Sequence, residues 1–193
     1  MACLVIALLP AMSPTVARGC LICIGFPTKT DADYLAEGHC VILARADADD
    51  PFSYAPFETL KGTYDGQKID LLVDSVNRRF FQTNPDRRVV LVQEEQGGPW
   101  RHLGIASEAY ESIVRRVVIC SPEWQGETGA SRRVQFFLPL FGHDDPNIRQ
   151  LAYLEVGRAP YPTIKKLGRV AARDDYLPML TESRYLEWRP LAI

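Results

Sequence analysis

The sequence contains few groups that could act as a general base at neutral pH, because only three of its 193 residues are histidine. These are His39, His102 and His143, and none stands in a known catalytic pattern. The chain also lacks the nucleophile-elbow, zinc-protease, P-loop and dinucleotide-binding motifs. We therefore predict no catalytic residues, no cofactor and no metal site.

A strong charge of one sign is also missing. The chain has 22 basic and 24 acidic residues, which gives a net charge of −2 at pH 7. Proteins that bind nucleic acids or membrane surfaces usually concentrate positive charge, so the composition favours neither kind of partner. Hydrophobic residues make up 47% of the chain, which is typical of a globular protein with enough apolar side chains for a core.

Long hydrophobic runs are absent apart from one near the start, at residues 4–9, and no later stretch approaches the ~18 residues of a membrane span. The run leads to Ala17-Arg18-Gly19, whose small first and third residues fit a signal-peptidase site. We predict that residues 1–19 are a signal peptide and that the mature chain begins at Cys20, secreted or periplasmic. No Lys or Arg precedes the run, so a buried N-terminal strand or helix is the alternative.

Four cysteines follow this cleavage site: Cys20, Cys23, Cys40 and Cys120. Outside the cytoplasm cysteines form disulfides, and we expect these four to fix the N-terminus, with three pairings open. The C-x-x-C of Cys20 and Cys23 allows a thiol oxidoreductase as an alternative. However, no strand precedes it, and no second ligand pair completes a zinc site. A lipid anchor at Cys20 is disfavoured, because Ala17 stands where Leu is usual.

The first part of the mature chain has the pattern of a small β domain with flanking helices. A helix is expected over residues 28–37 with Thr30 as its cap, and another over 107–118 after Ser107. In the second helix, Glu111 and Arg115 form an i,i+4 pair in the favourable orientation. Turn clusters separate five expected strands, the last two forming a hairpin: residues 40–46, 52–60, 69–73, 88–93 and 100–106. We predict an α+β fold whose five strands form an OB-like barrel over residues 20–124.

The composition changes after residue 124. The polar stretch 125–133 predicts a domain boundary, and helices are expected over residues 134–141 and 145–157. Asp145-Pro146 opens the second of these, because proline suits the first helical position.

A repeat with a period near 40 is present in this C-terminal part. Residues 137–141 recur as 176–180, and residues 151–153 recur as 191–193. Such a period is typical of α-solenoids, and residues 145–152 resemble the second helix of a HEAT repeat. The resemblance implies a HEAT-like helical segment over residues 131–193 that stops partway through its second repeat. An uncapped repeat leaves an apolar face, so we expect self-association through the C-terminal helices.

Several features of residues 20–120 resemble the netrin-like (NTR) fold, the OB-type barrel of the tissue inhibitors of metalloproteinases. They are a signal peptide ending at Cys20, the strand over residues 40–45, the later Leu60-Lys61-Gly62, and a helix followed by Cys120. In that family the N-terminal cysteine chelates the zinc of the target protease, and the resemblance implies this role for Cys20. The chain departs from the family in having C-x-x-C where the inhibitors have C-x-C.

Function is predicted as a class and not as a chemistry. The absence of a catalytic set favours an exported, non-enzymatic protein-binding module whose partner is another protein. The alternatives are a protease inhibitor acting through Cys20 and a thiol oxidoreductase using Cys20 and Cys23. Candidate partner-binding residues are Cys20 and a basic-aromatic patch in or beside a loop, formed by Arg78, Arg79, Phe80 and Phe81. We expect no nucleic-acid partner.

Overall fold

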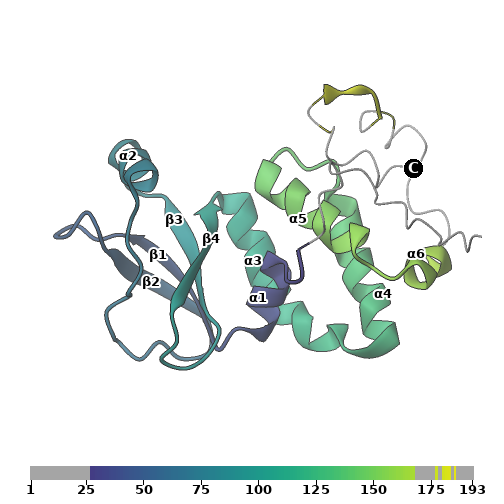
Figure 1. The fold of residues 1–193 in the computed structure, drawn as a ribbon, viewed down its shortest axis with the longest axis horizontal. Helices are drawn as coiled ribbons and strands as arrows, with labels where there is room; N and C mark the ends of the chain where they lie inside the picture. The colour runs from purple at the N-terminus through teal and green to yellow at the C-terminus, as the bar shows by residue number, and fades with distance from the viewer. Residues whose placement is uncertain (1–26, 168–176, 178–179, 184, 186–193) are drawn as a thin grey trace, which may run out of the picture.

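The computed structural model describes residues 27–167, 177, 180–183 and 185, with a β-sheet at one end of the molecule and most helices at the other (Figure 1). The described elements are, in chain order, α1 (Asp31–Glu37), β1 (Cys40–Ala46), β2 (Tyr54–Lys61), α2 (Ser75–Thr83), β3 (Arg88–Gln93), β4 (Trp100–Ala106), α3 (Glu108–Cys120), the 3-10 helix η1 (Ser121–Trp124), α4 (Gly126–Phe137), the 3-10 helix η2 (Leu138–Leu140), α5 (Pro146–Gly157) and α6 (Tyr161–Lys166). This is an α+β fold, as the sequence predicts. Across the described residues, no helix combines the length and apolarity needed to cross a bilayer.

The sheet is antiparallel, and its strand order is β2-β1-β3-β4. The expected hairpin of β3 and β4 is present, with Val89 opposite Ile105. The central strands β1 and β3 are buried along most of their length. Burial on both faces explains why their sequences are continuous apolar runs and do not alternate with polar residues.

The prediction of a strand over residues 69–73 is wrong. This segment pairs with no strand, and it is held by separate contacts at its two ends. The Asp70 carboxylate accepts a hydrogen bond from the Trp100 backbone N–H at 3.4 Å, and the Val73 N–H donates to the Phe52 carbonyl at 2.8 Å. Ile69 and Val73 are buried in the core, so the apolar pattern that predicted a strand is satisfied by burial without a ladder. The described sheet therefore has four strands and not five.

The sheet is strongly curved. Tyr54 lies on the edge strand β2 and His102 on the opposite edge strand β4, yet their ring centroids are only 6.2 Å apart. Register shifts in the β1–β2 and β3–β4 pairs are the kind of irregularity that increases local twist and bend. The concave face is filled by one apolar cluster: Cys40, Ile42, Ala44, Tyr54, Ile69, Val73, Phe81, Val89, Leu91 and Trp100.

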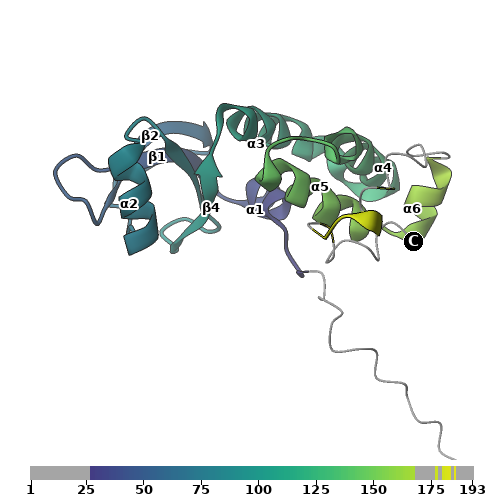
Figure 2. The same ribbon diagram turned by 90° about the horizontal axis from the view of Figure 1, so that it is seen from above.

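The other face of the sheet shares a second apolar cluster with α1, α3, α4 and α5. Its buried members include Leu35, Val41, Val90, Tyr110, Val114, Phe137, Ile148 and Leu151. Figure 2 shows α1 and α3 lying between the sheet and the helices α4, α5 and α6. The cluster is therefore continuous from the sheet to α5.

The helix caps are formed as predicted. Thr30 makes a capping box with Asp33 at the start of α1, and the Ser107 hydroxyl accepts the Tyr110 N–H at the start of α3. At the start of α5, Asp145 is the cap and Pro146 is the first helical residue. Each side-chain oxygen satisfies backbone N–H groups that have no partner within the helix.

The polar stretch expected as a boundary lies largely within helix α4. Its polar residues include Arg133, which is mostly buried and forms ion pairs with residues on two other helices. Gly129 lets α4 approach the preceding turn, because a Cβ there would lie 2.2 Å from the backbone carbon of Trp124. The polar residues of this stretch are therefore partly exposed to solvent and partly engaged in ion pairs with buried carboxylates. The second copy of the expected repeat lies almost entirely outside the described residues.

Helix α2 was not expected from the sequence. Asp74 caps it, and its side chain accepts the N–H groups of Val76 and Asn77. Only Phe81 on this helix is buried. The helix is amphipathic, but it is only nine residues long and most of its residues are polar, so its sequence resembles that of a loop.

Candidate functional site

The predicted basic-aromatic patch lies on α2 and not in a loop, and its four residues have different environments. Phe81 is buried at 5% exposure in the concave cluster, so its ring packs in the core and not at the surface. Phe80 is partly buried against the same cluster. The Arg78 guanidinium lies over the Phe52 ring at 4.1 Å from its centroid, and Arg79 is exposed. Arg78 and Arg79 are therefore the members that offer polar groups at the surface.

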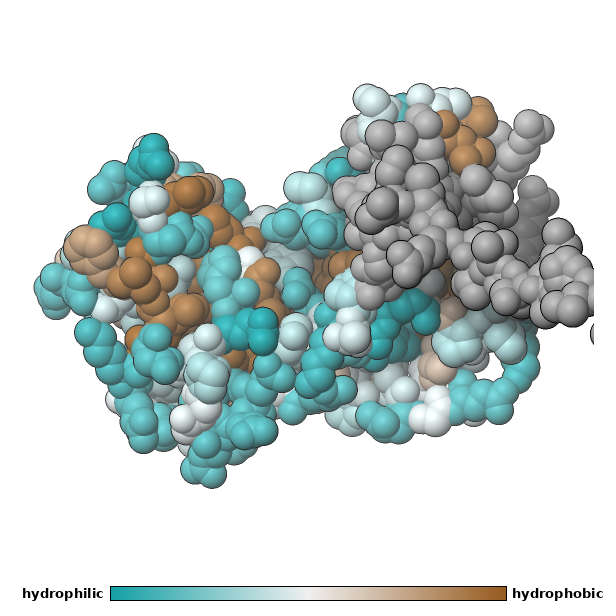
Figure 3. Space-filling model, viewed as in Figure 1, coloured by the Kyte–Doolittle hydropathy of each residue, from teal (hydrophilic) through white to brown (hydrophobic). Residues whose placement is uncertain are grey.

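Exposed apolar side chains gather beside the start of α2. Phe52, Leu72 and Val76 are 47%, 67% and 68% exposed. The hydrogen bond from Val73 to the Phe52 carbonyl brings the first two together, and Val76 follows in the first turn of the helix. We call Phe52, Leu72, Val76 and Arg78 the distal patch, because it lies on the sheet end of the molecule. Figure 3 shows apolar side chains gathered on this end.

A polar group lies beneath α2, on the concave face of the sheet. Its members are Tyr54, Asp74 and Asn77, with His102 stacked on Tyr54. Burial raises the pKa of Tyr54 to about 12. Burial also lowers the pKa of His102, although the Asp74 carboxylate opposes this. The buried Nε2 of His102 has no hydrogen-bond partner, so the group does not form a relay of the kind that activates a nucleophile.

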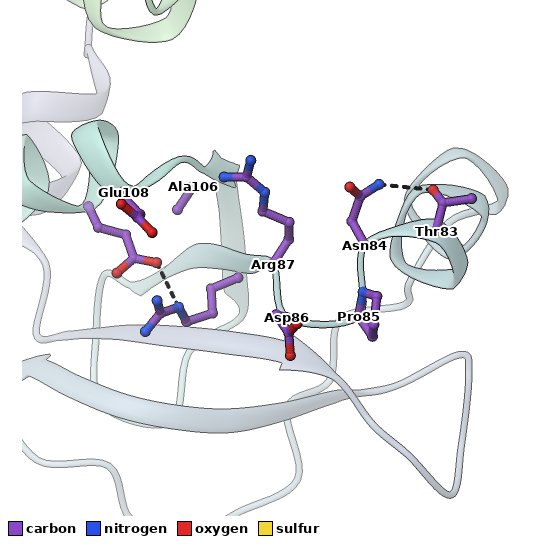
Figure 4. A pocket seen from close by; sticks show the side chains of 9 residues that line it. Thr83, Asn84, Pro85, Asp86, Arg87, Ala106 and Glu108 are labelled. Carbon is purple, nitrogen blue, oxygen red and sulfur yellow. Dashed lines mark hydrogen bonds and ion pairs between the residues drawn. The ribbon is translucent and has the colours of Figure 1, made fainter.

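A pocket of about 340 Å³ lies at the opposite end of α2, where the chain turns into β3 and faces the start of α3. Its lining residues are Thr83, Asn84, Pro85, Asp86, Arg87, Arg88, Ala106, Glu108 and Glu111. Figure 4 shows Glu108 and Ala106 on one side of Arg87, with Asn84 and Thr83 on the other. The pocket therefore combines one turn and one helix start that are about 20 residues apart in sequence.

The charged side chains of this pocket are partly paired. Arg88 Nε lies 2.7 Å from Oε1 of Glu111, whose exposure is only 7%. Burial raises the pKa of Glu111, and Arg88 opposes that rise. Arg88 also lies 4.7 Å from the ring centroid of Phe57, which is half exposed. The Glu111–Arg88 pair thus fixes one wall of the pocket.

The i,i+4 ion pair predicted within α3 is not formed as a direct contact. Arg115 instead forms a bidentate ion pair with Glu58 of β2, with N–O distances of 2.5 and 2.6 Å. Glu111 forms an ion pair with Arg88 of β3. Contacts to the sheet replace the local pair because they also join two elements through well-oriented charge-assisted hydrogen bonds.

A second ionic group joins α1 to the helical end of the molecule. Arg133 lies 2.6 Å from both Asp33 and Glu155, and Arg158 pairs with Asp33 from the end of α5. Burial alone would raise the pKa of Asp33, but the Thr30 N–H and the two guanidiniums hold that pKa below its usual value. The carboxylates and guanidiniums are paired with one another, so this ionic group has a structural role in joining α1 to α4 and α5.

The described cysteines are both free thiols. Cys40 is fully buried in the concave cluster, and burial raises the pKa of its thiol. Cys120 packs against the cluster on the other face, so the sheet separates the two. Cys20 and Cys23 lie outside the described residues, as does the predicted signal peptide, and a disulfide from either to Cys40 or Cys120 remains a prediction.

The remaining histidines do not build a site. The ring Nδ1 of His143 accepts the Asp145 N–H and so supports the start of α5. His39 is exposed before β1. No group of three or more metal-ligating side chains occurs within the part of the chain that the structure describes.

Sequence reasoning missed most of the residues that the structure brings together. Leu72 and Val76 belong to no recognisable motif. Glu108 stands in the first turn of a predicted helix, where the helix dipole favours an acidic residue whether or not that residue has another role. Arg87 and Arg88 stand out as a basic pair in the sequence, but nothing local indicates that Arg88 pairs with Glu111. No protein-family model matches the chain, and no curated protein or solved structure is significantly similar to it.

Proposed function

We propose that this chain is an exported, non-enzymatic protein-binding module and that its partner docks on the distal patch. The observation that carries the proposal is the exposure of Leu72 and Val76 beside Phe52. Exposed apolar residues scattered singly are normal, but adjacent ones rimmed by polar groups are typical of interaction sites.

The chemistry of the patch suits a protein partner. The Arg78 guanidinium is already ordered by stacking on Phe52, so little side-chain entropy remains to be lost on binding. Arginine and large apolar or aromatic side chains at the centre of an interface contribute most of its binding energy. A partner with a small apolar surface flanked by hydrogen-bond acceptors complements this arrangement.

The proposal also includes the family resemblances. Four antiparallel strands, a closing helix and Cys120 at its end support a netrin-like domain in the N-terminal part. The α4–α5 pair, with Asp145-Pro146 at the start of α5, supports a HEAT-like unit. Export rests on the sequence of residues 1–20, and mass spectrometry of exported protein should find Cys20 as the first residue. An intact Met1 on protein outside the cytoplasm contradicts export by this route.

The distal patch is tested with a double variant, Leu72→Ser with Val76→Ser. The matched control is Ile119→Ser, which replaces a residue of 73% exposure on α3, away from the patch. Protein of each kind, checked by circular dichroism for an unchanged fold, is cross-linked to partners in the exported fraction. We expect a partner that wild type and the control retain, that the double variant loses, and that rebinds wild type when purified. Equal retention by the double variant and wild type contradicts the proposed surface.

A further inference from the structure

The pocket beside Arg87 contains hydrogen-bond acceptors that the fold does not use. Glu108 lines the pocket from the first turn of α3, and its carboxylate makes no ion pair or hydrogen bond with any residue that the structure describes. Glu111 is nine-tenths buried, and its ion pair with Arg88 involves one oxygen, Oε1. The second Glu111 oxygen keeps its capacity to accept a hydrogen bond.

The balance of charge at the pocket is negative. Arg88 and Glu111 neutralise each other, so the lining charges that remain are the carboxylates of Asp86 and Glu108 and the guanidinium of Arg87. Two negative charges against one positive charge favour a cation. The start of α3 carries a partial positive charge, and Glu108 and Glu111 in its first turn compensate it.

The uncharged walls suit a ligand with an aliphatic stem. Pro85 and Ala106 line the pocket and carry no charge. A volume of about 340 Å³ is at the lower end of the range for small-ligand sites, and it accommodates one long side chain and not a large cofactor.

We propose that this pocket binds the ammonium or guanidinium group of a lysine or arginine side chain of the protein partner. The stem of that side chain lies against Pro85 and Ala106, and its charged end donates hydrogen bonds to Glu108 and Glu111. This inference rests on the proposed function, because the basic side chain belongs to the proposed protein partner. Arg87 should weaken this binding, because its guanidinium repels the incoming cation.

The pocket is tested with small probes in place of the partner. Nα-acetyl-lysine N-methylamide carries the side-chain ammonium and no other charge, Nα-acetyl-norleucine N-methylamide lacks that ammonium, and acetate is the anionic probe. Binding to the full chain is followed by NMR through the backbone amides of Arg87, Ala106 and Glu108. We expect the lysine probe to bind with a millimolar Kd, and neither of the other two to bind.

Two opposite charge changes decide the sign of the site. Glu108→Gln should weaken binding of the lysine probe about threefold to tenfold, as expected for loss of one partly exposed charge-assisted contact. Arg87→Gln should strengthen that binding about twofold to threefold, because a repulsive charge is removed. The matched control Glu95→Gln changes an exposed turn residue outside the pocket and should leave the Kd unchanged.

The outcomes separate this inference from the proposed function. Absence of lysine-probe binding, or acetate binding that Arg87→Gln abolishes, overturns the pocket inference while leaving the distal patch intact. The Leu72→Ser, Val76→Ser protein should still bind the lysine probe, because the pocket lies at the other end of α2. A partner retained equally by that double variant overturns the proposed surface, whatever the probes show.

Discussion

At the scale of single residues, Asp31 lies where the charge of its carboxylate lowers the stability of the fold. Asp31 begins α1, where the helix dipole favours an acid. However, burial raises the pKa of Asp31 to about 6, although a hydrogen bond with the Tyr110 side chain opposes this. The nearby Glu155 carboxylate adds to the rise. The folded protein therefore holds a proton on Asp31 more tightly than the unfolded chain does.

Replacing Asp31 with asparagine should therefore stabilise the protein at neutral pH. A folded-state pKa above the unfolded value of about 3.8 means that ionised Asp31 destabilises the fold above pH 6. We expect Asp31→Asn to raise the free energy of unfolding by about 1–2 kcal/mol at pH 7.5, after allowance for solvent screening. The gain should fall away as the pH decreases from 6 to 4, because wild type then becomes protonated.

Urea denaturation at pH 4 and at pH 7.5 measures this difference. Asp49→Asn, on an exposed loop, is the control and should change stability by less than about 0.5 kcal/mol at both values. A destabilised Asp31→Asn protein at pH 7.5 contradicts the prediction, and shows that the charge is favourable where it stands.

At the scale of elements, α1 illustrates how a short helix is stabilised by its neighbours. A helix of seven residues is not stable in isolation. Thr30 caps its start, and the Lys61 amine donates to the carbonyls of Leu35 and Ala36 near its end. Arg133 of α4 and Arg158, the C-terminal cap of α5, both form ion pairs with Asp33. Helix α1 is thereby bound at both ends and on one side.

Removing Arg133 should loosen α1 from α4 and α5. Arg133→Ala leaves Glu155 and Asp33 buried without this partner, and losing one member of a buried ionic group costs about 3–5 kcal/mol. Arg158 still compensates Asp33, so we expect a loss of about 2–4 kcal/mol in the free energy of unfolding. Chemical denaturation followed by circular dichroism measures it.

The adjacent Arg132 provides the control for this experiment. Its pair with Glu123 is exposed on both sides, and exposed pairs contribute about 0–1 kcal/mol. Arg132→Ala should therefore be close to wild type. Similar losses in the two variants would indicate that helix propensity, and not the buried ionic group, determines the result.

At the scale of the whole molecule, one apolar cluster connects the sheet to the helices. Val134, Phe137, Ile148 and Leu151 belong to the same buried cluster as Val41 and Tyr110 of the N-terminal part. The buried members of the cluster on the concave face of the sheet, by contrast, all come from residues 40–100. The helical end therefore relies on packing that it does not supply itself.

The helical part alone should be unstable. A fragment that begins at Gln125 keeps α4 whole but loses the packing of α1 and α3 against α4 and α5. Each apolar side chain that returns to water forgoes ~1.5–3 kcal/mol, against a total stability of ~5–15 kcal/mol for an ordinary domain. We expect the fragment to associate or to melt without cooperativity, whereas the full chain melts cooperatively. Sedimentation and thermal circular dichroism distinguish these behaviours, and a monomeric, cooperatively melting fragment contradicts the prediction.

Local signals predicted much of the fold. Thr30, Ser107 and Asp145 cap helices as expected, because a cap depends on a side chain and the backbone groups a few residues away. The hairpin of β3 and β4 followed from two apolar runs joined by a short glycine-containing turn. Residues 69–73 and α2 were predicted incorrectly, because the burial of Ile69, Val73 and Phe81 comes from contacts with distant strands.

Short-range patterns were enough to predict the α+β class, the helix caps and four of the strands, since each depends on residues close together along the chain. Which charges meet depends on the folded arrangement: Arg88 pairs with Glu111, Arg115 with Glu58, and Arg133 with Asp33. The folded arrangement also decides which apolar residues stay exposed, including Leu72 and Val76. Both outcomes depend on where distant segments lie in space, because pairing and burial are properties of contacts and not of residue types.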